Sequence, residues 1–271
     1  MKRAIFVIAA LSLGLGACHS KPTVNPNLTQ SSQRPAPGTP GNPTNSQRAA
    51  AARVNIELGL GYLQEGNLEY AKEKLDKARS EDPDLPELHG AMALLDQRLG
   101  RDKEADKEFR DALKATPNDP SMLNNYAVFL CSHGKPDDGV RSFERAATNP
   151  LYSTPWAAYT NAGVCLHAAH RDDEAAARFD QALRANPAYS EAVFQASSLD
   201  LSLQKLADAR LRIDLFLLGN PSTPDLLLLA WQIADAQHDQ AAQLRYAARL
   251  GREFPNSDQA RALASARAHP G

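Results

Sequence analysis

The chain has 271 residues, a formal net charge of −2 at pH 7 and 43% hydrophobic residues, which suffice for a buried core. Nucleic-acid binding requires an excess of basic residues to neutralise phosphates, so the near-neutral charge argues against a DNA or RNA partner. Only 6% of the residues are aromatic and β-branched runs are few. This composition excludes an all-β fold and favours packed helices.

The N-terminus has the pattern of a secretory signal. Lys2 and Arg3 precede an apolar run over residues 4–17. This run is too short to cross a hydrocarbon core of roughly 30 Å as a stable transmembrane helix. A basic start followed by a short apolar segment instead predicts a signal that is removed after export.

The apolar run ends in the sequence Leu-Gly-Ala-Cys over residues 15–18, which resembles a bacterial lipobox. The resemblance implies a lipoprotein signal peptide over 1–17 and a covalent lipid on Cys18. An ordinary secretory signal with a chance cysteine is the alternative. Because His19 rather than Asp follows the cysteine, similarity to enterobacterial sorting rules implies the outer membrane rather than the inner one.

A tether is predicted over residues 18–47, which follow the signal. This segment contains six prolines together with many Gly, Ser, Asn and Thr residues, and almost no large apolar side chain. It cannot bury enough surface to offset the entropy lost on ordering. We therefore expect a flexible chain whose ends are about 30 Å apart.

From residue 52 onward the chain repeats with a period of 34 residues, the length of a tetratricopeptide (TPR) helix-turn-helix unit. The units start at residues 52, 86, 120, 156, 190 and 224. Their eighth positions are Gly59, Ala93, Ala127, Gly163, Ser197 and Trp231. The small side chains let two helices cross closely, and larger residues at the twenty-fourth position fill the layer between units. We expect an all-α, right-handed superhelical TPR solenoid of about six helix-turn-helix repeats over 48–257.

Prolines mark the ends of most units, and a capping signal marks the end of the array. Five units end on a proline, which stops the second helix because it lacks the backbone donor. The sixth unit departs most from the pattern, as expected for the terminal unit of a solenoid. Ser257 and Asp258 then introduce an Ala- and Arg-rich segment over 258–271, which is either a capping helix or a tail.

Parts of the first and third units resemble a known family. The resembling segments are residues 58–64 (LGLGYLQ), 66–67, 71–72, 123–126 (LNNY) and 129–130. Together with the lipobox they are similar to the type IV pilus biogenesis and stability lipoproteins of the PilF/PilW family, over roughly residues 50 to 257. Members of this family are six-repeat TPR lipoproteins.

The resemblance implies a non-enzymatic outer-membrane lipoprotein, anchored at the periplasmic face and needed for type IV pilus (fimbrium) biogenesis and twitching motility. It implies a pilotin, which binds the pilus secretin and promotes its outer-membrane localisation and multimerisation. The alternative is a general envelope TPR scaffold that recruits outer-membrane or peptidoglycan assembly factors. Apart from the lipid on Cys18, we expect no cofactor. We also expect the protein to bind neither a small-molecule substrate nor nucleic acid.

A groove lined by the first helices is the predicted partner-binding site. The positions that point into the concave face of such solenoids carry apolar and amide side chains here. Amides offer both a donor and an acceptor to an extended peptide, although they can equally satisfy neighbouring helix ends or water. The groove residues are Ile56, Leu60, Leu63, Gln64, Asn124, Asn125, Val128, Thr160, Asn161 and Val164.

Two cysteines remain beyond Cys18. Cys131 and Cys165 are 34 residues apart, which places them near the ends of neighbouring first helices. A disulfide forms in an oxidising compartment if the two Cα atoms lie about 4.4 to 6.8 Å apart. The insertion after the third unit shifts the phase of the pair, so two buried free thiols are the alternative.

Chemical signatures are lacking elsewhere. His167 and His170 lie three residues apart on one helix, but neither Cys165 nor Asp172 supplies a convincing third metal ligand. There is no Gly-rich phosphate loop and no nucleophile elbow, and acidic residues are scattered as on solvated helix faces. We therefore expect no metal site, no catalytic residue and no enzymatic activity.

Overall fold

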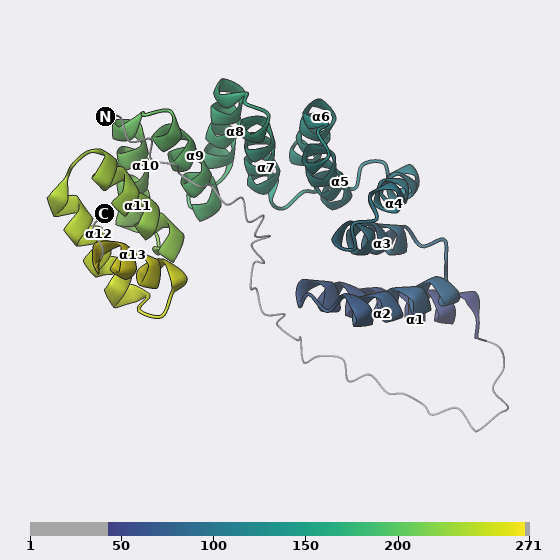
Figure 1. Ribbon diagram of the computed structural model, residues 1–271. Helices are drawn as coiled ribbons and strands as arrows, with labels where there is room; N and C mark the ends of the chain where they lie inside the picture. Colours follow the sequence, from purple (N-terminus) through teal and green to yellow (C-terminus); the bar gives the residue numbers. More distant parts are fainter. Residues whose placement is uncertain (1–42, 269–271) are drawn as a thin grey trace. The chain divides into compact units, whose positions relative to one another are not determined.

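The computed structural model of the protein describes the backbone of residues 43–268 and the side chains of residues 43–265 (Figure 1). Within this part of the chain there are thirteen α-helices and no strand, so the predicted all-α fold is confirmed. The chain divides into two compact units, Met1–Pro83 and Asp84–Gly271.

The first unit contains the helix pair α1 (Asn45–Gln64) and α2 (Leu68–Glu81). Ala71 and Leu75 on the inner side of α2 are fully buried. A β-carbon added to Gly59 would lie 2.7 Å from Leu75 Cδ2, well inside van der Waals contact. The two helices therefore approach this closely because position 59 has no side chain.

Helix α1 begins earlier than the sequence analysis predicts. Thr44 Oγ1 accepts a hydrogen bond from the Gln47 N–H at 3.3 Å, and Gln47 Oε1 accepts one from the Thr44 N–H at 2.8 Å. This capping box satisfies two backbone donors and starts the helix at Asn45. The predicted end of the tether at residue 47 is thus corrected to residue 44. The rest of the tether, the signal segment and Cys18 lie outside the described residues.

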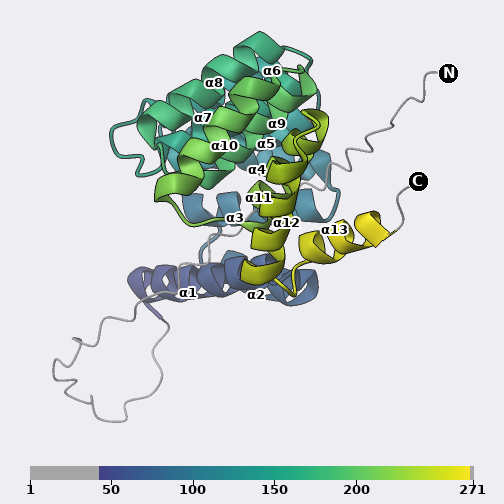
Figure 2. The ribbon, with the colours of Figure 1, turned by 90° about the vertical axis from the view of Figure 1, so that its left-hand side faces the viewer.

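The second unit is built from helix pairs that lie side by side (Figures 1 and 2). Each second helix packs on the first helix of the next pair, as TPR units do. The first helices of the pairs are α3 (Pro86–Arg98), α5 (Pro120–Ser132), α7 (Pro155–Ala168), α9 (Ser190–Ser202) and α11 (Pro224–Ala236). The second helices are α4 (Asp102–Ala115), α6 (Pro136–Ala147), α8 (Asp172–Ala185), α10 (Leu206–Gly219) and α12 (Gln240–Glu253).

The repeated small and aromatic positions form the core of this unit. Ala93 and Ala127, at the eighth position of their repeats, are fully buried. The twenty-fourth position carries Phe109, Phe143 and Phe179, which are all at most 2% exposed. Small residues at the crossing and phenylalanines between the layers thus produce the helix-turn-helix repeats predicted from the 34-residue period.

The turns inside the pairs all need a left-handed backbone conformation. Glycine provides it in the first three repeats, at Gly66, Gly100 and Gly134 with φ of 76°, 70° and 70°. His170, Gln204 and His238 take the same conformation in the next three, with φ of 59°, 60° and 58°. For a residue with a side chain the left-handed conformation costs roughly 1–2 kcal/mol of conformational free energy. Three such residues adopt it nevertheless, so the packing of the helix pairs imposes the turn geometry.

The C-terminal segment forms a further helix, α13 (Asp258–Ala268). Ser257 caps it, since its Oγ accepts a hydrogen bond from the Ala260 N–H at 3.1 Å. Leu263 of α13 is buried in the core cluster of the last repeats, against which Trp231 also packs. The described part of the segment is therefore a capping helix rather than a tail.

A disulfide joins Cys131 at the end of α5 to Cys165 of α7, with the two Cα atoms 5.6 Å apart. A β-carbon on Gly139 would lie 2.4 Å from Cys131 Sγ, so glycine at that position leaves room for the sulfur. The bond links the first helices of two successive repeats, where the sequence left the choice between a disulfide and free thiols open.

We expect the small positions to be intolerant of one extra methyl group. A β-carbon on Gly163 would lie 2.4 Å from the Phe179 ring, so Gly163→Ala should lower the free energy of unfolding by about 1–3 kcal/mol. Gly251 in α12 has open space around it, so Gly251→Ala is the matched control and should be neutral or stabilise by up to about 1 kcal/mol. Urea unfolding followed by circular dichroism measures both, and equal effects of the two changes would contradict the packing described here.

The disulfide should stabilise the second unit. Closing a 34-residue loop is worth on the order of 2–4 kcal/mol, so Cys131→Ala with Cys165→Ala should destabilise the protein by about that amount. The bond itself is checked by mass spectrometry of an unreduced digest of the protein. A cross-linked peptide containing both cysteines is expected, whereas free thiols on both residues would show that the bond does not form.

Candidate protein-binding site

Three side chains predicted to line the first-helix groove are buried. Ile56, Leu63 and Thr160 are 3%, 5% and 1% exposed. Thr160 Oγ1 donates to the Trp156 carbonyl oxygen at 2.8 Å, a bond within α7 that uses the hydroxyl proton. A partner cannot reach these three side chains, so the structure removes them from the predicted groove.

Two of the predicted amides bond each other. Asn161 Nδ2 of α7 donates to Asn124 Oδ1 of α5 at 3.1 Å. Val128 and Val164 are partly buried and pack against the core of the same repeats. For this pair of amides the structure favours the interpretation that they satisfy neighbouring helices. The hydrogen bond between the two amides joins two successive repeats.

Three groove residues are left as predictions. Asn125 is partly buried on α5, and Leu60 and Gln64 lie on α1 in the first unit, where Leu60 is partly buried and Gln64 exposed. These side chains retain accessible surface. Nothing in their surroundings singles them out as partner contacts.

A tyrosine next to the amides belongs to a charged cluster between α4 and α5. Tyr126 Oη donates to Asp106 Oδ1 at 2.8 Å, and Asp106 also forms an ion pair with Arg110. Burial and the hydrogen bond to Asp106 raise the pKa of Tyr126 to about 12, so the phenol stays protonated at neutral pH. The cluster therefore fastens two helices together.

The two histidines have separate roles in the structure. His167 Nδ1 lies 2.6 Å from Asp172 Oδ1, which links the end of α7 to the start of α8. His170 occupies the left-handed position of the turn between these helices. Within the described residues, no group of three or more His, Cys, Asp or Glu side chains is placed to hold a metal ion.

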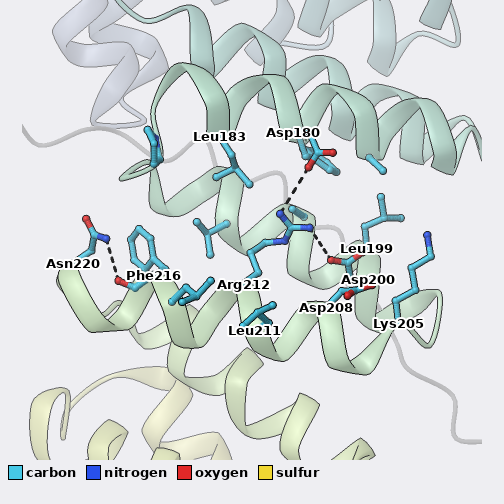
Figure 3. Close-up of a pocket in the computed structure, with 16 residues that line it drawn as sticks. Asp180, Leu183, Leu199, Asp200, Lys205, Asp208, Leu211, Arg212, Phe216 and Asn220 are labelled. Atoms are coloured by element: carbon cyan, nitrogen blue, oxygen red, sulfur yellow. Dashed lines mark hydrogen bonds and ion pairs between the residues drawn. The ribbon is translucent and has the colours of Figure 1, made fainter.

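A cavity of about 620 Å³ lies among α8, α9 and α10 (Figure 3). Phe179 and Leu183 of α8, Leu199 of α9 and Phe216 of α10 form much of its wall. Its lining is mostly apolar, with five charged side chains and one amide. The predicted groove used first-helix positions of the first, third and fourth repeats, so it does not include this cavity among α8, α9 and α10. The signal that points to it is the leucine-rich sequence of α10.

One arginine forms the polar centre of the cavity. Figure 3 shows Arg212 reaching from α10 toward Asp180 and Asp200. Arg212 Nη2 lies 3.0 Å from Asp200 Oδ2, and Nη1 lies 3.8 Å from Asp180 Oδ1. The Nε of the same guanidinium is buried and has no hydrogen-bond partner among the described residues. The arginine thus spans all three helices of the cavity.

The described helices carry no membrane span: none of them combines the length and the apolar character that crossing a bilayer requires.

The comparisons with known proteins agree on one family. Residues 62–128 match the tetratricopeptide repeat model. The chain is 30% identical over 214 residues to the type IV pilus assembly protein PilF of Pseudomonas aeruginosa, which covers 79% of this chain and 85% of that protein.

Two solved structures agree with this relationship. A structure of Pseudomonas aeruginosa PilF matches with a TM-score of 0.63 and 29% identity, covering 80% of this chain and 98% of that one. The crystal structure of PilW, described as a widely conserved type IV pilus biogenesis factor, matches with a TM-score of 0.65 and 26% identity over 79% of this chain and 98% of that one. By sequence and by fold, the chain belongs to the PilF/PilW family of TPR proteins that act in type IV pilus biogenesis.

Proposed function

We propose that the protein is a pilotin: it binds the secretin of the type IV pilus and promotes localisation and multimerisation of the secretin in the outer membrane. The observation that carries the proposal is the similarity to PilF over 79% of the chain. A pilus assembly factor made of stacked helix pairs acts through its surfaces, because such repeats offer extended areas for protein contact. Binding, rather than catalysis, is the proposed mode of action.

The proposed anchor is a lipid on Cys18. The lipobox at residues 15–18 supports it. Each methylene of an acyl chain contributes about 0.8 kcal/mol when it enters the bilayer, so several chains on one cysteine hold a protein at the membrane. An outer-membrane anchor would place the TPR repeats in the periplasm.

Secretin assembly in cells tests the proposal. Heat- and detergent-resistant secretin multimers are quantified in outer-membrane fractions of the wild type, a deletion strain, and the deletion strain complemented with wild-type or Cys18→Ala protein. We expect the multimers to disappear on deletion and to return with the wild-type gene. The unlipidated variant should leave them scarce or misplaced, because the protein is no longer held at the membrane.

Two outcomes would contradict this account. Multimers that persist at wild-type level in the deletion strain would refute the pilotin role, and a general envelope scaffold would then be the function to pursue. Full assembly with Cys18→Ala protein at equal abundance would refute the need for the lipid while leaving the pilotin role intact. Immunoblots of the protein itself control for abundance.

A further inference from the structure

The outer face of α10 exposes three leucines. Leu211, Leu215 and Leu218 are 58%, 59% and 84% exposed, while Ile213 and Phe216 on the opposite side of the helix are buried. Single exposed leucines are ordinary on protein surfaces, but a row of them on one helix marks an interaction site. Helix α10 is therefore apolar on both sides, although only one side is covered by the protein.

The same positions are nearly all polar in the other repeats. Leu211, Leu215 and Leu218 are the twenty-second, twenty-sixth and twenty-ninth residues of their repeat. The equivalent residues elsewhere are Glu73, Lys77, Ser80, Lys107, Asp111, Lys114, Arg141, Arg145, Thr148, Ala177, Gln181, Arg184, Arg245, Arg249 and Arg252. Only Ala177 among them is apolar. The packing of the repeats does not need apolar residues here, so these leucines serve something other than the fold.

The leucine row continues into the cavity. Leu211 and Leu215 line the cavity together with Leu183 of α8 and Phe216 of α10. The spacing of the row, four residues and then three, is that of the apolar seam along which one helix packs on another. An exposed row of leucines next to an apolar cavity can bind an amphipathic helix, whose apolar side chains would pack between α8 and α10.

The charges around the cavity indicate which charge the bound helix should carry. Asp180, Asp200 and Asp208 face two cationic groups, Lys205 and Arg212. Arg212 is engaged by Asp180 and Asp200. The three carboxylates outnumber the two cationic groups, so the rim carries one excess negative charge. A basic side chain on the incoming helix would match this rim.

The same charges argue against a second copy of the chain as the occupant. Two copies that pack the cavity lining of α8, α9 and α10 against each other would bring two rims, each with one excess negative charge, to one interface. Like charges across an interface cost affinity and are avoided in specific complexes. A partner with its own basic residues carries no such penalty.

We propose that the face formed by α8 and α10 binds an amphipathic helix of the secretin, with leucine-sized side chains on one side and a Lys or Arg beside them. This proposal rests on the proposed pilotin function, because it takes the secretin as the source of the helix. It places the contact on the second helices of the fourth and fifth repeats, away from the first-helix groove.

In-cell photo-cross-linking tests the occupant. The full-length protein carries p-benzoylphenylalanine at Leu215, or at Leu244 as a control that is equally exposed on α12, at 59% for both. We expect a Leu215-dependent adduct whose cross-linked peptide comes from the secretin and contains apolar residues with a Lys or Arg. An adduct with a second copy of this chain, an adduct with an acidic or fully polar peptide, or the absence of an adduct specific to Leu215 would each overturn the proposal.

Substitutions test the energetics and separate this proposal from the pilotin role. Leu215→Asp should weaken binding of purified full-length protein to the secretin by about tenfold or more, since it removes an apolar contact and adds negative charge. Leu244→Asp should leave the affinity unchanged, and Asp208→Lys should weaken binding through charge. Thermal unfolding shows that each variant is folded, which is expected because the three side chains are exposed.

The outcomes distinguish the two claims. If deletion of the gene abolishes secretin multimers but Leu215→Asp restores them as well as the wild type does, the pilotin role stands and this binding face is refuted. If deletion leaves the multimers intact, the pilotin role itself fails. Equal loss of affinity in Leu215→Asp and Leu244→Asp would also refute the face, because the effect would then not depend on position.

Discussion

The close crossing of the two helices in each repeat is the constraint on which the rest of the structure depends. A β-carbon at position 163 would clash with the Phe179 ring, and one at position 59 would clash with Leu75. Because the pairs cross so closely, the turns between their helices must adopt one left-handed geometry, which His170 accepts even though glycine would adopt it at lower cost. Helix pairs of similar geometry can then stack, and the stack in the second unit has a first-helix side and a second-helix side.

The two faces of the second unit are used differently. On the first helices, a side-chain bond between Asn124 and Asn161 and the disulfide of Cys131 join successive repeats, so much of the polar surface there serves the protein itself. On the second helices, Leu211, Leu215 and Leu218 of α10 are exposed. A scaffold whose first helices are cross-linked and whose α10 exposes an apolar row is suited to holding a helix of another protein without changing its own structure.

The fold was largely predictable from sequence, whereas the binding surface was not. A 34-residue period with small residues at fixed positions is typical of the TPR helix-turn-helix unit, so the helix pairs could be predicted from the pattern. Burial at individual groove positions depends on how far each helix is rotated, and a one-residue change moves a side chain by about 100°. Ile56 and Thr160 were therefore misplaced, and a comparison of surface positions between repeats, rather than of core positions, was needed to notice Leu211 and Leu215.

The central claim is that this PilF/PilW protein uses its second-helix face to hold a secretin helix. Hydrogen–deuterium exchange of the full-length protein, with and without its purified secretin, tests the claim most directly because it reports every helix at once. The account predicts slower exchange in α8, α9 and α10 when the secretin is present, and unchanged exchange in α12. Protection confined to the first helices α5 and α7, or no protection anywhere, would contradict it.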